Sequence, residues 1–108
     1  MASLVTRQFD VIPNPDAVRR PAAPYLVVLQ SHLLYGMPTV VVAPMRRVDL
    51  IEKIADLQPD VTLRGEAYAV MIAELAHIPT RLLGKSVGSL ADQEDAIRRA
   101  LGRLFTGF

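Results

Sequence analysis

Cysteine and tryptophan are both missing from this 108-residue sequence. The lack of cysteine excludes disulfides and thiolate metal sites, and it is typical of proteins that work in a reducing compartment. An excess of charge is also missing, because 12 basic side chains are balanced by 11 acidic ones and the formal net charge is +1. Direct binding to nucleic acid is therefore disfavoured, since phosphate binding depends on clustered lysine and arginine.

Long hydrophobic runs are missing as well. The longest uncharged apolar stretches, residues 25–29 and 39–45, are far shorter than the roughly 20 residues that a membrane-spanning helix needs. Polar residues between positions 7 and 10 rule out a secretory signal, and we expect no membrane partner. Hydrophobic residues still make up 51% of the chain, enough for one core and too many for a disordered chain. We predict a leader over residues 1–6 and one soluble, cytoplasmic domain over residues 7–108.

The first part of this domain predicts a strand and then a loop. Phe9 and Val11 alternate with polar neighbours, so residues 7–12 are expected to form a half-buried strand. Residues 13–24 contain four prolines, each of which lacks an N–H donor and restricts the residue before it. This segment is predicted to be a surface loop, and loops of such length are often functional.

Residues 25–30 and 39–45 are two further predicted strands. Both are rich in β-branched and apolar residues and are separated by turn-forming residues, so we expect them to pair antiparallel. The continuous apolar run over residues 40–42 predicts burial on both faces of its strand. Pro44 predicts an edge or an end of that strand.

The middle of the chain predicts one helix and three more strands. Residues 48–57 place apolar side chains at helical spacing and predict a short helix. Residues 60–64 and 66–72 predict a second hairpin around Gly65. Residues 78–83 predict another strand.

The last element has the clearest pattern, a helix over residues 90–105. Ser89 precedes it as a capping residue, and Gly107 follows it as a left-handed terminator. One face of the helix carries apolar residues at helical spacing, namely Leu90, Ile97, Leu101, Leu104 and Phe105. Several strands followed by one helix predict a mostly β fold, a small barrel or curved sheet with the helix packed against it.

Few residues suggest catalysis. His32 and His77 are far apart and lack metal-ligand spacing, and residues 84–86 resemble only the end of a phosphate-binding loop. Ser31 directly precedes His32, which is poor geometry for a nucleophile and its base. The sequence therefore predicts neither an enzyme nor a cofactor.

Two apolar features suggest recognition of a partner instead. Leu33 and Leu34 follow polar residues and precede a turn. Either one of them completes the core and the other is incidentally exposed, or both belong to a protein-binding patch. The chain also closes on the apolar residues 104–108, where chain ends are usually polar. That end is expected to dock on its own core, on a symmetry mate or on a partner.

Short motifs spread along the chain point to a family. They are Gln8-Phe9, Gln30-Ser31 followed by Leu33-Leu34, the valine-rich run 40–45, Gly65-Glu66, Ile78-Pro79, residues 84–87, and Leu90-x-x-x-Glu94. In this order and spacing, residues 7–108 resemble the CcdB-type toxins of bacterial type II toxin–antitoxin modules. The resemblance implies an SH3-like antiparallel barrel with a small inserted sheet and a C-terminal helix, assembled as a homodimer.

The same resemblance implies a function without catalysis. Toxins of this type bind the A subunit of DNA gyrase and trap its covalent complex with cleaved DNA. A cognate antitoxin with a disordered tail wraps the dimer and blocks that binding, which suits a segment that folds on binding. Operator DNA is then a partner only indirectly, through the antitoxin.

The residues that bind gyrase are carried over position by position. Poisons of this family use an aliphatic pair and a C-terminal Phe-Trp-Gly-Ile, with an asparagine near the end of the helix. The corresponding residues here are Leu33, Leu34, Gly102, Phe105, Thr106, Gly107 and Phe108. Thr106 replaces the tryptophan, and loss of such an anchor typically costs about 2–4 kcal/mol of binding free energy. Gly102 replaces the asparagine and removes a polar side chain.

Three hypotheses follow. The leading one is a gyrase-binding toxin. The second is a homologue with weak or no poisoning, which binds the antitoxin and takes part in autoregulation of its operon. The third is a small nuclease, which the lack of an acid–base cluster disfavours.

Overall fold

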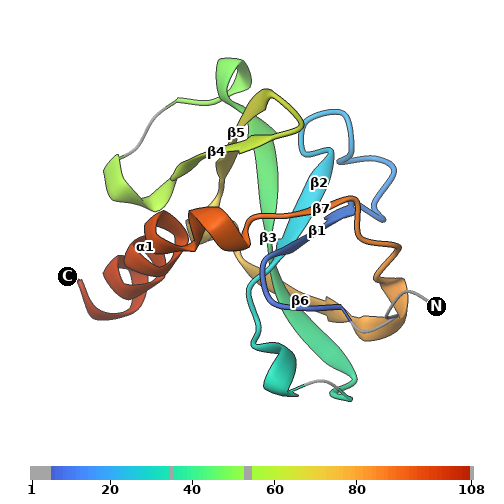
Figure 1. Cartoon of the computed structure of the whole chain (residues 1–108). Helices are drawn as coiled ribbons and strands as arrows, with labels where there is room; N and C mark the ends of the chain where they lie inside the picture. Colours follow the sequence, from blue (N-terminus) through green and yellow to red (C-terminus); the bar gives the residue numbers. More distant parts are fainter. Residues whose placement is uncertain (1–5, 35, 53–54, 108) are drawn as a thin grey trace.

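The computed structural model describes residues 6–34, 36–52 and 55–107 of the chain (Figure 1). In these residues it contains seven strands and one α-helix. They are β1 (Asp10–Pro13), β2 (Tyr25–Val28), β3 (Thr39–Arg47), β4 (Asp60–Leu63), β5 (Glu66–Val70), β6 (Ala76–Pro79), β7 (Gly88–Ser89) and α1 (Glu94–Thr106). Short 3₁₀ turns join them, namely η1 (His32–Leu34), η2 (Val48–Leu50), η3 (Ala55–Leu57), η4 (Ile72–Glu74), η5 (Thr80–Leu82) and η6 (Ala91–Gln93).

The strands form one antiparallel sheet that curls into a nearly closed barrel. Its order is β4-β5-β3-β2-β1-β7, and β6 pairs with the first half of β3 beside this path. α1 lies against the side of the barrel in Figure 1. The prediction of a mostly β, SH3-like antiparallel barrel with a C-terminal helix is confirmed. The predicted small inserted sheet is not separate, because all seven described strands belong to one sheet.

Side-chain hydrogen bonds close the gap between β4 and the far end of the sheet. The backbone N–H of Thr62 donates to Oε1 of Gln93 at 2.8 Å, and Nε2 of Gln93 donates back to the carbonyl of Thr62 at 2.9 Å. Arg64 donates to the carbonyl of Val87 at 2.7 Å. The amide of Gln93 thus pairs with β4 much as a neighbouring strand would.

Both faces of the sheet around β3 carry buried apolar residues. The main cluster fills the barrel and includes Ile97 and Ala100 of α1, with Leu101 and Leu104 packed at its margin. The smaller second cluster lies on the other face and consists of Ile12, Leu26, Val28, Val40 and Val42. The predicted burial of residues 40–42 on both faces is confirmed, because Val41 packs against the main cluster.

Both predicted hairpins are present. β2 pairs antiparallel with β3, with Val27 opposite Ala43. β4 and β5 are joined by Arg64 and Gly65, whose φ angles of 53° and 79° form a tight turn with two left-handed residues. The proline-rich residues 14–24 form the predicted loop, without strand or helix.

Some predicted elements were wrong at their boundaries. The first strand begins only at Asp10, because Phe9 adopts a φ of 71° in a turn while its side chain enters the main cluster. β3 continues through Pro44, whose missing N–H falls between the stretches that pair with β6 and with β5. The carbonyl of Pro44 still accepts a hydrogen bond from Met71 at 2.9 Å.

Two predicted elements have another secondary structure than expected. The prediction of a helix over residues 48–57 is wrong, because the 3₁₀ turns η2 and η3 occupy this range, and Lys53 and Ile54 lie outside the described residues. Val48 is exposed and Ile51 is only half-buried, so the predicted apolar face does not enter the core. The strand over residues 78–83 is also wrong, because β6 ends at Pro79 and η5 follows.

The C-terminal helix begins later than predicted. The hydroxyl of Ser89 accepts the N–H of Ala91 at 3.1 Å and starts η6, and regular α-helix begins at Glu94. Gly107 ends the helix with a φ of 80°, and its N–H donates to the carbonyl of Arg103 at 2.9 Å. On the barrel side, the guanidinium of Arg98 lies 5.3 Å from the ring centre of Phe9.

Residues 1–5 lie outside the described part of the chain, so the leader over residues 1–6 stays a prediction. Among the helices that the structure describes, none is both long and apolar enough to cross a membrane.

Candidate functional site

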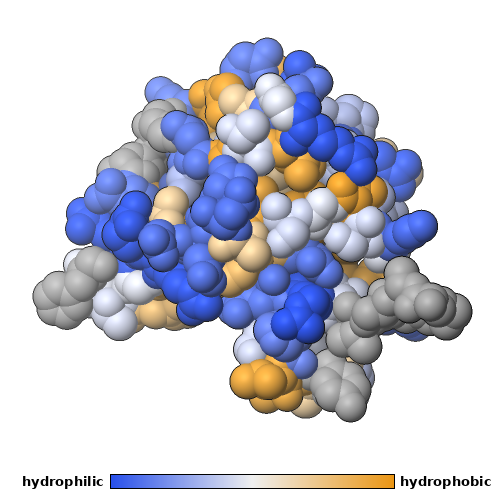
Figure 2. Space-filling view, viewed as in Figure 1, coloured by the Kyte–Doolittle hydropathy of each residue, from blue (hydrophilic) through white to orange (hydrophobic). Residues whose placement is uncertain are grey.

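The leucine pair lies in η1 at one tip of the molecule. Leu33 is 83% exposed and Leu34 is 54% exposed, and nearby Met37 is 50% exposed. We call these three residues the η1 surface. Figure 2 shows hydrophobic surface at the tip that carries η1. The alternative that one leucine completes the core is wrong, because neither is buried.

Local hydrogen bonds hold η1 in this exposed position. The hydroxyl of Ser31 accepts the N–H of Leu33 at 3.1 Å, and the Ser31 carbonyl accepts that of Leu34 at 3.0 Å. Arg7 donates to Nε2 of His32 at 3.2 Å, which ties the turn to the start of the domain. The turn is therefore held by hydrogen bonds of polar residues, and neither of its leucines is buried.

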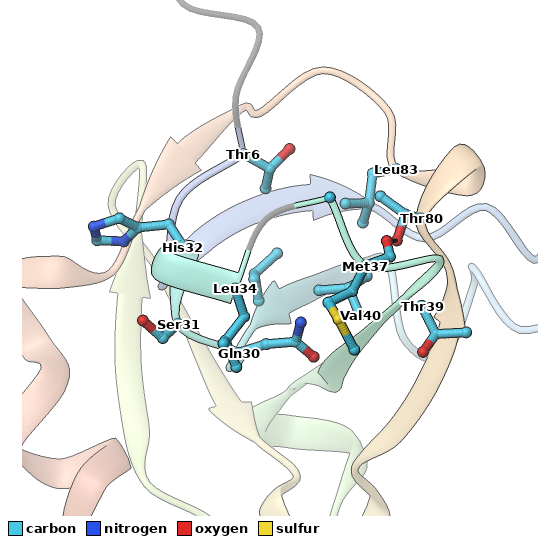
Figure 3. A pocket seen from close by; sticks show the side chains of 12 residues that line it. Thr6, Gln30, Ser31, His32, Leu34, Met37, Thr39, Val40, Thr80 and Leu83 are labelled. Carbon is cyan, nitrogen blue, oxygen red and sulfur yellow. Dashed lines mark hydrogen bonds between the residues drawn. The ribbon is translucent and has the colours of Figure 1, made fainter.

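A pocket of about 310 Å³ opens beside η1 (Figure 3). Figure 3 shows Leu34, Met37 and Val40 around its centre, with Thr6 at its rim and the ring of His32 pointing away. The amide of Gln30 borders it, and Oε1 of Gln30 accepts the N–H of Val41 at 3.3 Å. The sequence did not indicate this pocket, because its residues come from three separate segments, residue 6, residues 28–40 and residues 80–83.

The second predicted contact region is the end of α1. We call Gly102, Phe105, Thr106 and Gly107 the α1 end. Phe105 is 70% exposed, whereas Leu104 beside it packs against the main cluster. The helix therefore docks on its own core through its leucines and presents Phe105 to solvent. Phe108 was predicted as part of this region and lies outside the described residues.

Thr106 and Gly102, where the resemblance implies a tryptophan and an asparagine in the family's poisons, contact each other. The hydroxyl of Thr106 donates to the backbone carbonyl of Gly102 one turn earlier. This bond turns the polar group of Thr106 back along the helix. The α1 end thus presents a single aromatic ring among its described residues, that of Phe105.

One chain does not bring the two regions together. In Figure 1 η1 lies at the lower tip, whereas the end of α1 lies at the left beside the C-terminus. The predicted gyrase-binding residues thus form two separate surfaces on one chain.

Catalytic chemistry has little support at either surface. Within residues 6–34, 36–52 and 55–107, no group of three or more His, Asp or Glu side chains is placed to hold a metal ion. Nε2 of His32 accepts a hydrogen bond from Arg7, since a guanidinium only donates, so this nitrogen is not paired with Ser31.

The pKa of Tyr68 is raised above its usual value, first by burial and then by Glu66, whose carboxylate accepts a hydrogen bond from the Tyr68 hydroxyl at 3.1 Å. Tyr68 belongs to the main cluster rather than to either surface.

The profile of the family described as CcdB protein matches residues 8–107. The chain belongs to the CcdB family. No curated protein sequence matches it. Among solved structures, the Mycobacterium tuberculosis toxin MazF-mt6 is similar, with a TM-score of 0.68 and 22% identity over 92% of this chain and 96% of that one. At this identity, the likeness shows a shared fold alone.

Family membership fixes the broad role of this CcdB-family chain. CcdB proteins are toxins of toxin–antitoxin modules and do not form a catalytic family. The chain is therefore a toxin of such a module, with a cognate antitoxin as its partner.

Proposed function

We propose that this toxin binds the A subunit of DNA gyrase and traps the complex of gyrase with cleaved DNA. The proposal is carried by the exposed leucine pair of η1, which the resemblance to the family's poisons matches to their aliphatic pair. Exposed adjacent leucines on a rigid turn are a common form of protein-binding anchor. Phe105, Thr106 and Gly107 of the α1 end, with Gly102 and Phe108, form the second part of the contact.

The working unit in this proposal is a cytoplasmic homodimer. A pair of chains supplies each surface twice and can place the η1 surface of one protomer beside the α1 end of the other. The antitoxin covers the dimer and neutralises it, and operator DNA is reached only through the antitoxin. The formal net charge of +1 fits a protein that does not bind DNA by itself.

A second candidate is a homologue with weak or no poisoning, which serves as the antitoxin's partner in operon autoregulation. The bond between Thr106 and Gly102 favours it, because the α1 end lacks the large ring of the poisons and turns its hydroxyl inward. A loss of about 3 kcal/mol at such an anchor weakens binding roughly a hundredfold.

A gyrase cleavage assay distinguishes the two candidates. Purified protein is added to gyrase and supercoiled DNA, with and without the antitoxin. Cleaved complexes that accumulate with the toxin and disappear with the antitoxin support poisoning. Tight antitoxin binding without cleaved complexes selects the second candidate and contradicts the first.

A further inference from the structure

We propose that the pocket beside η1 is the anchor site for the A subunit of gyrase and receives one uncharged aliphatic side chain of that partner. This inference rests on the proposed function and names the chemistry of the contact. Leu34 is both a wall of the pocket and part of the η1 surface. A protein that covers the leucine pair therefore also covers the mouth of the pocket.

The floor of the pocket is formed before any partner arrives. Val28 and Val40 belong to the second cluster, and strand pairing fixes them, with Val28 opposite Val42 and Val40 opposite Ile78. Leu83 packs against the same cluster from the far side. A preformed apolar floor lets a side chain bind without the cost of ordering the site.

Charge and hydrogen bonding select the kind of occupant. No aspartate, glutamate, lysine or arginine lies among the described residues that line the pocket, and a charged side chain would lose its hydration there without a counter-ion. Because Oε1 of Gln30 accepts from Val41, the amide nitrogen is left to donate, and Figure 3 shows it directed into the pocket. An aliphatic side chain of the partner suits the uncharged lining of the pocket. A backbone carbonyl of the partner beside that side chain can accept the hydrogen bond that the Gln30 amide donates.

The position of the pocket favours gyrase over the antitoxin or a second copy as the occupant. The pocket is continuous with the leucine pair, because Leu34 belongs to both, and the proposed function assigns that pair to the gyrase contact. Since Thr106 leaves the α1 end without its anchor, the pocket supplies an alternative one. It would then carry a larger share of the binding energy here than the α1 end does.

The test fills the pocket and measures binding. Figure 3 shows Thr6 at the rim with its side chain toward the pocket, so Thr6→Phe plugs it, and Thr6 lies outside any strand or helix. Thr62→Phe is the matched control, because Thr62 is exposed on β4 away from the pocket. Affinities for purified gyrase A and for the antitoxin are measured by calorimetry, and thermal melting checks that each variant is folded.

We expect Thr6→Phe to weaken gyrase A binding at least about tenfold. Thr62→Phe should bind gyrase A with the same affinity as the wild type. Antitoxin binding should be equal for all three proteins. If the wild type binds gyrase A and Thr6→Phe binds equally well, the pocket inference alone is overturned. If Thr6→Phe weakens antitoxin binding instead, or changes self-association, the pocket belongs to that partner and the inference also fails. A wild type that does not bind gyrase A overturns both the inference and the proposed function.

Discussion

The hydroxyl of Thr106 donates to the carbonyl of Gly102, so its one donor is used within the last turn of α1 and is not offered to a partner. The resemblance implies a tryptophan at this place in the family's poisons, and such a ring can stack on a partner. This hydrogen bond joins the two positions, 102 and 106, that the resemblance marks as different from the family's poisons. A single substitution at position 106 can therefore test how much affinity for gyrase A an aromatic ring restores.

Thr106→Trp is expected to strengthen binding to gyrase A about a hundredfold and to increase toxicity on expression. The ring restores an aromatic anchor, and the carbonyl of Gly102 can bind water instead of the hydroxyl. Calorimetry with purified gyrase A measures the gain. Thr106→Val is the control, because it removes the hydroxyl without adding a ring and should leave the affinity unchanged. Equal affinity of the tryptophan variant and the wild type would show that Thr106 does not limit binding.

Replacing both Leu33 and Leu34 by serine is expected to weaken gyrase A binding at least about tenfold without destabilising the fold. Both side chains are exposed, so little buried surface is lost. Val18→Ser provides the comparison, since Val18 is 88% exposed on another loop. Thermal melting should show all three proteins within a few degrees of one another. A large drop in melting temperature for the double variant would mean that the leucines stabilise the barrel instead.

Gln93→Ala is expected to destabilise the fold by about 0.5–1.5 kcal/mol, because two hydrogen bonds to the backbone of Thr62 are lost at a solvent-exposed place. Denaturant unfolding measures the change. Asp92→Ala, at the exposed neighbouring position, should cost much less. If the two variants unfold at the same denaturant concentration, the amide of Gln93 contributes little to closure of the barrel.

The stability of the wild type is expected to fall as the pH rises above about 10, the usual pKa of tyrosine. Burial and Glu66 raise the pKa of Tyr68 in the folded state, so the neutral form is favoured there and unfolding releases a proton at high pH. The stabilisation is complete below the unfolded pKa and is lost as pH rises through the folded one. Melting temperatures at about pH 8 and about pH 10.5, on either side of the usual tyrosine pKa, measure this loss. Tyr68→Phe should show a smaller drop between the two, and an equal drop would assign the effect to other groups.

The hairpins could be predicted from the sequence because their signals are local. The glycine at position 65 and the valine run at 40–42 each act within a few neighbouring residues. The helix over residues 48–57 failed for the opposite reason, since helical spacing is stable only where a surface covers the apolar side. Val48 remains exposed and Ile51 is only half-buried, so the predicted apolar face does not enter the core.

The candidate site could also be predicted from the sequence only in part. The place of the leucine pair between polar residues and a turn left open whether one leucine was buried, and the structure shows that both are exposed. The pocket beside it could not be foreseen, because Thr6, Gln30 and Thr80 meet only when β3 pairs with both β2 and β6. The contact between Thr106 and Gly102 had a possible signal, since threonine in a helix often bonds the carbonyl four residues earlier.

The contact of Phe9 with Arg98 has a consequence for the order in which the molecule can be made. Phe9 enters the core from the first turn, yet the helix that carries Ile97 and Ala100 into the same core is the last element in sequence. Contacts between such distant segments form late, and domains fold as units during synthesis. A ribosome-bound chain that still lacks α1 therefore lacks Ile97 and Ala100 in its main cluster. We expect a nascent toxin to become competent for its partners only after its last helix has emerged.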